Sequence, residues 1–140
     1  MFNVECSMFN VERMSMQSIQ ERSFEFAVRI VRLYDYLMTK RGAARTIAYQ
    51  MLKSGTSVGA NLEEAGAAQS KADFVSKCSI ASKEARETRY WLRLVTGCRS
   101  VKKERVADLV QEAGEIVAIL TSIVKKAGSS PNRSTFNIQH

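Results

Sequence analysis

Basic side chains are concentrated in one short segment of this chain, and their type and spacing indicate the clearest chemistry in it. Residues 83–105 include eight basic and three acidic residues, a net charge of +5, within a chain whose total charge is +7. The basic residues are Lys83, Arg86, Arg89, Arg93, Arg99, Lys102, Lys103 and Arg105. Arginine donates two parallel hydrogen bonds to phosphate oxygens. The segment therefore predicts binding to an anionic partner, with nucleic acid first and an anionic membrane second.

The first four of these residues lie on a predicted helix, away from its apolar face. The rise from Arg86 to Arg93 is about 10 Å, enough to meet more than one phosphate. Tyr90 and Trp91 adjoin this row, but Trp91 belongs to the core side, and no pattern typical of single-strand binders occurs. We expect contacts to the nucleic-acid backbone, which weaken as salt rises. A solvated face is the alternative interpretation. Membrane binding is not favoured, because the row has no exposed apolar face beside it.

Other chemistry is poorly supported by the residues present. The single histidine is His140, at the end of the chain, which argues against histidine-based catalysis and metal sites. The sequence contains neither a phosphate-binding GxxxxGK[ST] loop nor a GxSxG nucleophile motif. Two carboxylate pairs, Glu63 with Glu64 and Glu84 with Glu87, are more typical of structural ion pairs than of acid catalysts. The chain is predicted to be non-enzymatic, without cofactor or metal.

Apolar residues recur at helical spacing, and no strand-like alternation is present. The pattern predicts an all-α, up-down-up-down antiparallel four-helix bundle. The predicted helices cover about 23–41, 44–69, 71–96 (capped by Ser70 with Asp73) and 101–128 (capped by Ser100). Gly55, Gly59 and Gly66 lie on one side of the second helix. They predict close approach of a neighbouring backbone, unless 55–59 is a break between two shorter helices.

The second and third helices each carry a stripe of residues at helical spacing, and these stripes predict contact with protein on more than one side. Phe74, Cys78, Ala81, Ala85, Thr88, Leu92 and Val95 form an apolar seam on the third helix. A small polar stripe on the second helix, with two charged residues of the third, predicts a structural network or subunit seam. Its members are Ser54, Ser57, Asn61, Glu64, Lys77 and Glu84. We expect Lys77 to pair with Asp35 or Glu64, and Glu84 with Asn61 or Ser57.

The apolar face of the first helix is wider than one packing partner covers, which predicts contact with another subunit. The alternative function is a scaffold that docks a partner protein through the wide apolar faces of helices one and three. Residues 1–20, which repeat MFNVE, are expected to be a weakly ordered leader, 21–127 the bundle, and 128–140 a disordered tail. No signal-peptide pattern occurs, and three cysteines without metal spacing indicate reduced thiols in the cytoplasm.

The motifs SGTSVGANLEEA, SKADF and KEARETRYWL resemble the bacterial family of proteins encoded in intervening sequences of 23S ribosomal RNA genes. The resemblance covers about residues 24–124. It implies a four-helix bundle that assembles as a homopentamer with a basic surface and a nucleic-acid-associated role without enzymatic activity. More distantly it extends to the accessory protein of diversity-generating retroelements, whose bundle binds a reverse transcriptase and structured RNA. A reverse transcriptase is thus a candidate protein partner, although this chain is more similar to the intervening-sequence branch.

Overall fold

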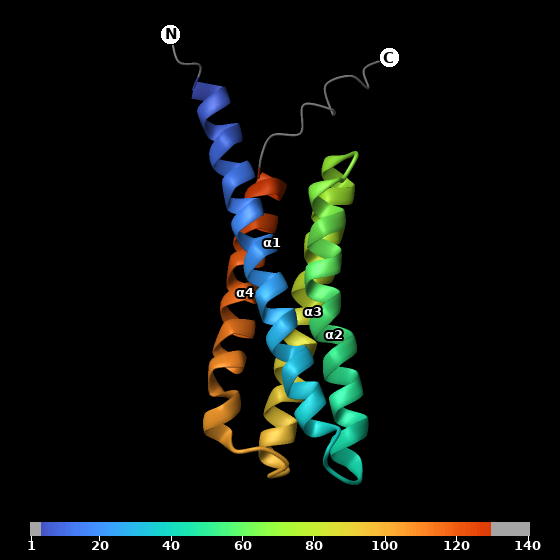
Figure 1. Ribbon diagram of the computed structural model, residues 1–140. Coiled ribbons are helices and arrows are strands. Elements are labelled where there is room, and N and C mark those ends of the chain that lie inside the picture. Colours follow the sequence, from blue (N-terminus) through green and yellow to red (C-terminus); the bar gives the residue numbers. More distant parts are fainter. Residues whose placement is uncertain (1–3, 130–140) are drawn as a thin grey trace.

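Four helices joined by short turns make up most of the chain, and they confirm the predicted all-α bundle. The computed structural model describes the backbone of residues 4–129 and the side chains of residues 15–128. The helices are α1 (Val4–Leu37), α2 (Ala43–Gly66), α3 (Lys71–Gly97) and α4 (Lys103–Ser129). Neighbours in sequence pack side by side, and α4 returns beside α1 (Figure 1). The α1–α4 junction is much less extensive than the other three junctions.

The first helix begins earlier than predicted. It starts at Val4 instead of about Ser23, and Ser23 lies buried inside it. Residues 4–22 contain no glycine or proline, and Ile19 is 1 % exposed, so core packing continues well before Ser23. The helix ends at Leu37, and Gly42 then precedes α2 with a φ of 75°, a conformation that side chains with a Cβ rarely adopt. Residues 1–3 of the expected leader and 130–140 of the expected tail lie outside the described residues.

The second helix runs without a break through residues 55–59, so the two-helix alternative is wrong. Its glycines allow α1 to approach closely. A Cβ added at Gly59 would lie 3.7 Å from the backbone oxygen of Ser23, and one at Gly55 would lie 2.9 Å from Ile30 Cγ2. The expected close approach is therefore confirmed, by backbone at Gly59 and by a side chain at Gly55.

The third helix agrees with the prediction at its start and along its seam. Ser70 Oγ accepts a hydrogen bond of 3.0 Å from the backbone N–H of Asp73. Six of the seven predicted seam residues are buried, and Phe74 is half-buried against the core. The fourth helix begins at Lys103, so its N-cap position is residue 102, and Ser100 lies two residues too early to cap it as predicted.

Candidate nucleic-acid interface

The four basic residues predicted on the third helix form an exposed row. Lys83, Arg86, Arg89 and Arg93 all have exposed side chains, while the core-facing positions of α3 are buried. Arg86 and Arg93 are seven residues apart, close to two turns, and lie nearly in line along the helix. The Arg89 guanidinium carbon lies 4.0 Å from the position of a Cβ added at Gly114 of α4. The row therefore runs along the outer surface of α3, with Arg89 on the side that faces α4.

The turn after α3 places three further cations. The Ser100 N–H donates to the Val95 carbonyl and the Arg99 N–H to the Thr96 carbonyl, both at 3.0 Å. This pair of bonds is the Schellman closure, which requires a left-handed residue at its centre. Arg99 occupies that position with a φ of 59°. Its side chain, with those of Lys102 and Lys103, is exposed at the end of the row.

Arg105 is exposed but does not join the row. Its guanidinium carbon lies 4.4 Å from the centre of the Tyr36 ring of α1, with the Lys40 ammonium 4.9 Å from the same ring. Of the eight predicted residues, the structure therefore places seven along α3 and the following turn, and Arg105 on the side of α4 that faces α1.

Carboxylates do not neutralise this surface. Among the described residues, none of the eight basic side chains lies within 4.0 Å of an acidic oxygen. Glu87 lies beside the row but accepts a hydrogen bond of 3.1 Å from the indole N–H of Trp91. Tyr90, 55 % exposed, meets Trp91 edge to face at 5.1 Å. Because the cations lack acidic partners, they are available to an external anion.

The predicted polar network is present only in part. Lys77 Nζ lies 2.6 Å from Glu64 Oε2, one of the two pairings expected, and this contact raises the pKa of Lys77. Asn61 Nδ2 donates to the Ser57 carbonyl at 2.8 Å, and not to Glu84. The expected pairing of Glu84 with Asn61 or Ser57 is absent from the described part of the chain. The carboxyl stays partly exposed, and burial raises its pKa, as does neighbouring Glu87, against the effect of Lys53.

A buried hydrogen bond joins the polar stripe to the seam of α3. The hydroxyls of Ser54 and Thr88 lie 2.8 Å apart, and Thr88 Oγ1 is also 2.7 Å from the Glu84 carbonyl. Ser54 thus serves the packing of α2 on α3. It is not exposed to a second subunit.

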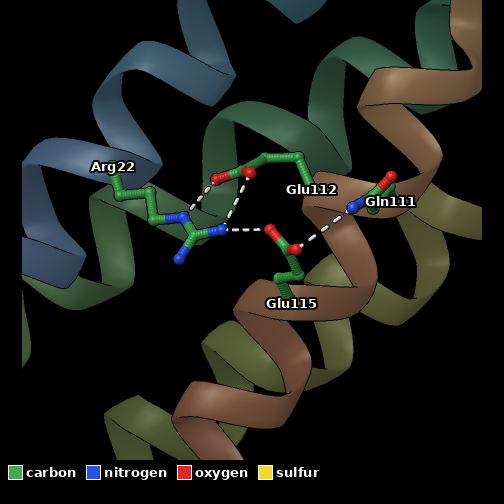
Figure 2. Close-up of polar contacts among 4 residues, drawn as sticks. All are labelled: Arg22, Gln111, Glu112 and Glu115. Atoms are coloured by element: carbon green, nitrogen blue, oxygen red, sulfur yellow. Dashed lines mark hydrogen bonds and ion pairs between the residues drawn. The ribbon is translucent and has the colours of Figure 1, made fainter.

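Sequence reasoning missed the ion cluster between α1 and α4. Arg22 forms a two-pronged pair with Glu112, in which Nη2 lies 2.9 Å from Oε2, and it also pairs with Glu115 (Figure 2). Gln111 Nε2 donates to the other oxygen of Glu115 at 3.3 Å. The Arg22 hydrogen bond lowers the pKa of Glu112 despite its burial. The three-residue spacing of Glu112 and Glu115 was the available signal, because it puts both carboxylates on one helix face.

Two further findings limit the chemistry of the described residues. No group of three or more His, Cys, Asp or Glu side chains within residues 15–128 is placed to hold a metal ion. None of the four helices, over their described residues, is both long enough and apolar enough to cross a membrane. His140 lies outside the described residues.

Comparison with known proteins places the chain in a sequence family. The sequence model described as 23S rRNA-intervening sequence protein matches residues 16–122. A crystal structure from Bacteroides thetaiotaomicron, described as a protein with unknown function from the S23 ribosomal protein family, is 42 % identical. The match covers 79 % of this chain and 98 % of that one, with a TM-score of 0.73. No curated protein shows significant sequence similarity to this chain.

Proposed function

Because this chain belongs to the family of 23S rRNA-intervening sequence proteins, we propose that it is a non-enzymatic cytoplasmic bundle that binds structured RNA. The observation that carries the proposal is the exposed row of Lys83, Arg86, Arg89 and Arg93, continued by the turn cations and without acidic partners among the described residues. If acidic side chains neutralised such a row, it would lose its attraction for phosphate. Because acidic side chains of the described residues do not neutralise this row, its charge can attract phosphate.

The row is suited to the nucleic-acid backbone more than to base edges. Its cations lie along one outer helix face, and only Tyr90 offers an exposed aromatic ring beside them. Arginine and lysine contacts to phosphate position a duplex without reading its sequence. We expect binding that depends on charge and shape, with little preference for base sequence.

We also propose that the protein self-associates into a homo-oligomer, and a homopentamer is the form we favour. Phe24 is 67 % exposed and Val31 39 % exposed on α1, and Ile80 is 37 % exposed on α3. Phe24 and Val31 are seven residues apart and lie nearly in line on α1, and exposed apolar side chains grouped on one face are typical of a protein interface. The proposed polar part of the subunit interface consists of the residues of the predicted polar network that are not buried. They are Ser57, Asn61, Glu64, Lys77 and Glu84. A ring would repeat one weak basic surface several times and gain avidity.

Mass measurement of the dilute protein tests the assembly. Wild type is expected to be oligomeric, and Phe24→Glu to form a smaller species with unchanged helix content, because a charge cannot be buried cheaply at an apolar contact. A wild-type protein that stays monomeric at micromolar concentration would contradict the assembly.

Binding of a labelled hairpin RNA tests the RNA proposal. The variant Arg86→Gln/Arg93→Gln removes two charges and spares Arg89, which packs on α4. Affinity at 0.1 M salt should fall about tenfold for each phosphate that is no longer bound, and the slope of log affinity against log salt should fall by about two. The matched control, Lys53→Gln/Lys125→Gln, removes two exposed charges elsewhere and should bind like wild type. If the row variant and the control variant bind the hairpin equally well, the row is not the RNA-binding surface.

A partner-protein scaffold is the second candidate, favoured by the exposed Phe24 and Val31 of α1. A reverse transcriptase is one candidate partner for such a scaffold. Apolar contacts persist when salt screens charge, whereas backbone contacts to RNA weaken. Retention of a protein partner in high salt, with loss on Val31→Glu, would favour the scaffold.

A further inference from the structure

A second set of cations gathers at one end of the bundle. The turns α1–α2 and α3–α4 lie together at the end opposite the two termini (Figure 1). The α1–α2 turn and the start of α2 contribute cations that the row on α3 does not include. The cations of this end are Lys40 and Arg41 from the α1–α2 turn, Arg45 from the start of α2, Arg99 and Lys102 from the α3–α4 turn, and Lys103 and Arg105 from the start of α4.

Tyr36 joins the two turns. The Lys40 ammonium lies 4.9 Å and the Arg105 guanidinium carbon 4.4 Å from the centre of its ring, so the two cations are within about 9 Å of each other. A ring face attracts cations through its quadrupole. One aromatic side chain thus holds two like charges in place, one from each half of the sequence.

In the protein without a bound anion, the repulsions that involve these charges are not relieved and are destabilising. Among the described residues, no carboxylate oxygen lies within 4.0 Å of any of the seven. Lys103 and Arg105 lie in the first turn of α4, where Glu104 is the acidic residue, and Arg45 lies in the first turn of α2, which has none. Cations repel the positive end of a helix dipole. A bound anion would relieve both repulsions.

We propose that this end of the bundle binds the phosphate backbone of duplex RNA, with Tyr36 positioning Lys40 and Arg105 as a cation pair. The proposal rests on the proposed RNA-binding function and adds a contact surface from the α1–α2 turn. A nucleic-acid duplex carries about one negative charge per 1.7 Å of its axis in the DNA form. Two cations within about 9 Å of each other can therefore both reach phosphates of one duplex.

The surroundings favour nucleic acid over a lipid surface. Binding to a membrane requires an apolar face beside the charges. None of the five exposed large apolar side chains among residues 15–128 lies in either turn, and Tyr49, one helical turn after Arg45, is a single aromatic ring and not an apolar face. Phosphate is the shared chemistry, and the two sources are separable by experiment.

Three double variants test the surface against a labelled hairpin RNA across a salt series. They are Lys40→Gln/Arg41→Gln at the bundle end, Arg86→Gln/Arg93→Gln on the row, and the control Lys53→Gln/Lys125→Gln. We expect the bundle-end variant to lose at least about tenfold in affinity at 0.1 M salt, with a reduced salt slope, and the control to match wild type. If the row variant loses affinity and the bundle-end variant does not, this inference is wrong and the proposed function stands. If wild type does not bind, both are wrong.

Substitutions of Tyr36 test its positioning role without changing charge. Tyr36→Phe keeps the ring and should bind like wild type, whereas Tyr36→Leu should lose about threefold in affinity. An unchanged salt slope in Tyr36→Leu would show that the cations remain but are no longer held. Equal affinities for both variants would overturn the role of the ring. Binding of wild type to phosphatidylserine vesicles, with no binding to the hairpin, would overturn the choice of partner.

Discussion

Replacing Glu112 by glutamine should loosen the junction between α1 and α4, the least extensive of the four in the bundle. The Glu112 side chain is 19 % exposed and receives two hydrogen bonds from Arg22, which is 35 % exposed. Hydrogen bonds to charged groups contribute about 1.5–3 kcal/mol when shielded, and exposed ion pairs about 0.2–1 kcal/mol. Partial exposure places this pair between these limits, so we expect a loss of about 1.5 kcal/mol at pH 7.

Glu115 supplies the matched control, because it meets the same guanidinium from a more exposed position, 46 %. Glu115→Gln should cost about 0.5 kcal/mol, at the level of a surface pair. Unfolding entropy is about 0.3 kcal/mol/K for a chain of 140 residues. The expected Tm decreases are then about 5 °C for Glu112→Gln and about 2 °C for Glu115→Gln, measured by calorimetry. Amide exchange should accelerate in α1 more than in α3.

The pH dependence separates an ionic contribution from simple packing. The hydrogen bond from Arg22 holds the folded pKa of Glu112 below its usual 4.5. A lowered carboxyl pKa stabilises the fold fully above the unfolded value, and this contribution disappears as pH falls through the folded value. The Tm difference between wild type and Glu112→Gln should therefore be constant near neutrality, begin to shrink near pH 4.5, and vanish once the pH is below the lower pKa of the folded protein. Equal losses for the two variants, or a difference that persists in acid, would refute the reasoning.

Four further substitutions probe the backbone and the core. Arg99→Gly should raise stability by up to about 1 kcal/mol, measured by urea unfolding, because glycine adopts the left-handed position without a Cβ penalty, a gain that outweighs its greater unfolded-state freedom. Gly55→Ala should cost about 1–3 kcal/mol, since its Cβ would press on Ile30, whereas Gly97→Ala, with open space, should gain about 0.5–1 kcal/mol in the same assay. Thr88→Val should cost about 1–2 kcal/mol by breaking a buried hydrogen bond, and no loss would assign Thr88 to packing alone.

The features that could be predicted from the sequence are local or periodic. The seam of α3 follows from side chains that recur every three or four residues, and the Ser70–Asp73 cap from two residues of one turn. The start of α1 could not be placed, because residues before Ser23 contain no breaker and the packing of Ile19 depends on other helices. The end of α3 at Gly97 agrees with the predicted end at about residue 96, but the left-handed residue that closes the turn after it, Arg99, could not be singled out from the sequence.

Contacts between distant helices were predictable only as possibilities. Periodicity assigns Arg22 to a face of α1 and Glu112 to a face of α4, but the two are 90 residues apart and nothing local matches them. Glu84 shows the opposite error. A charged residue in an apolar sector was expected to need a partner, but its position at the edge of the buried face leaves the carboxyl in contact with water.

The distribution of ion pairs divides the charged residues of the described chain into two groups with different tasks. Acidic side chains stabilise junctions, as Glu112 does between α1 and α4 and Glu64 does between α2 and α3. The cations of the α3 row and of the bundle end have no acidic partners among the described residues, so their charges contribute to no ion pair in the fold. Substitutions in the second group should therefore change the proposed RNA binding with little effect on unfolding, and substitutions in the first group the reverse. If a substituted protein still folds but no longer binds, the loss can therefore be assigned to the substituted surface.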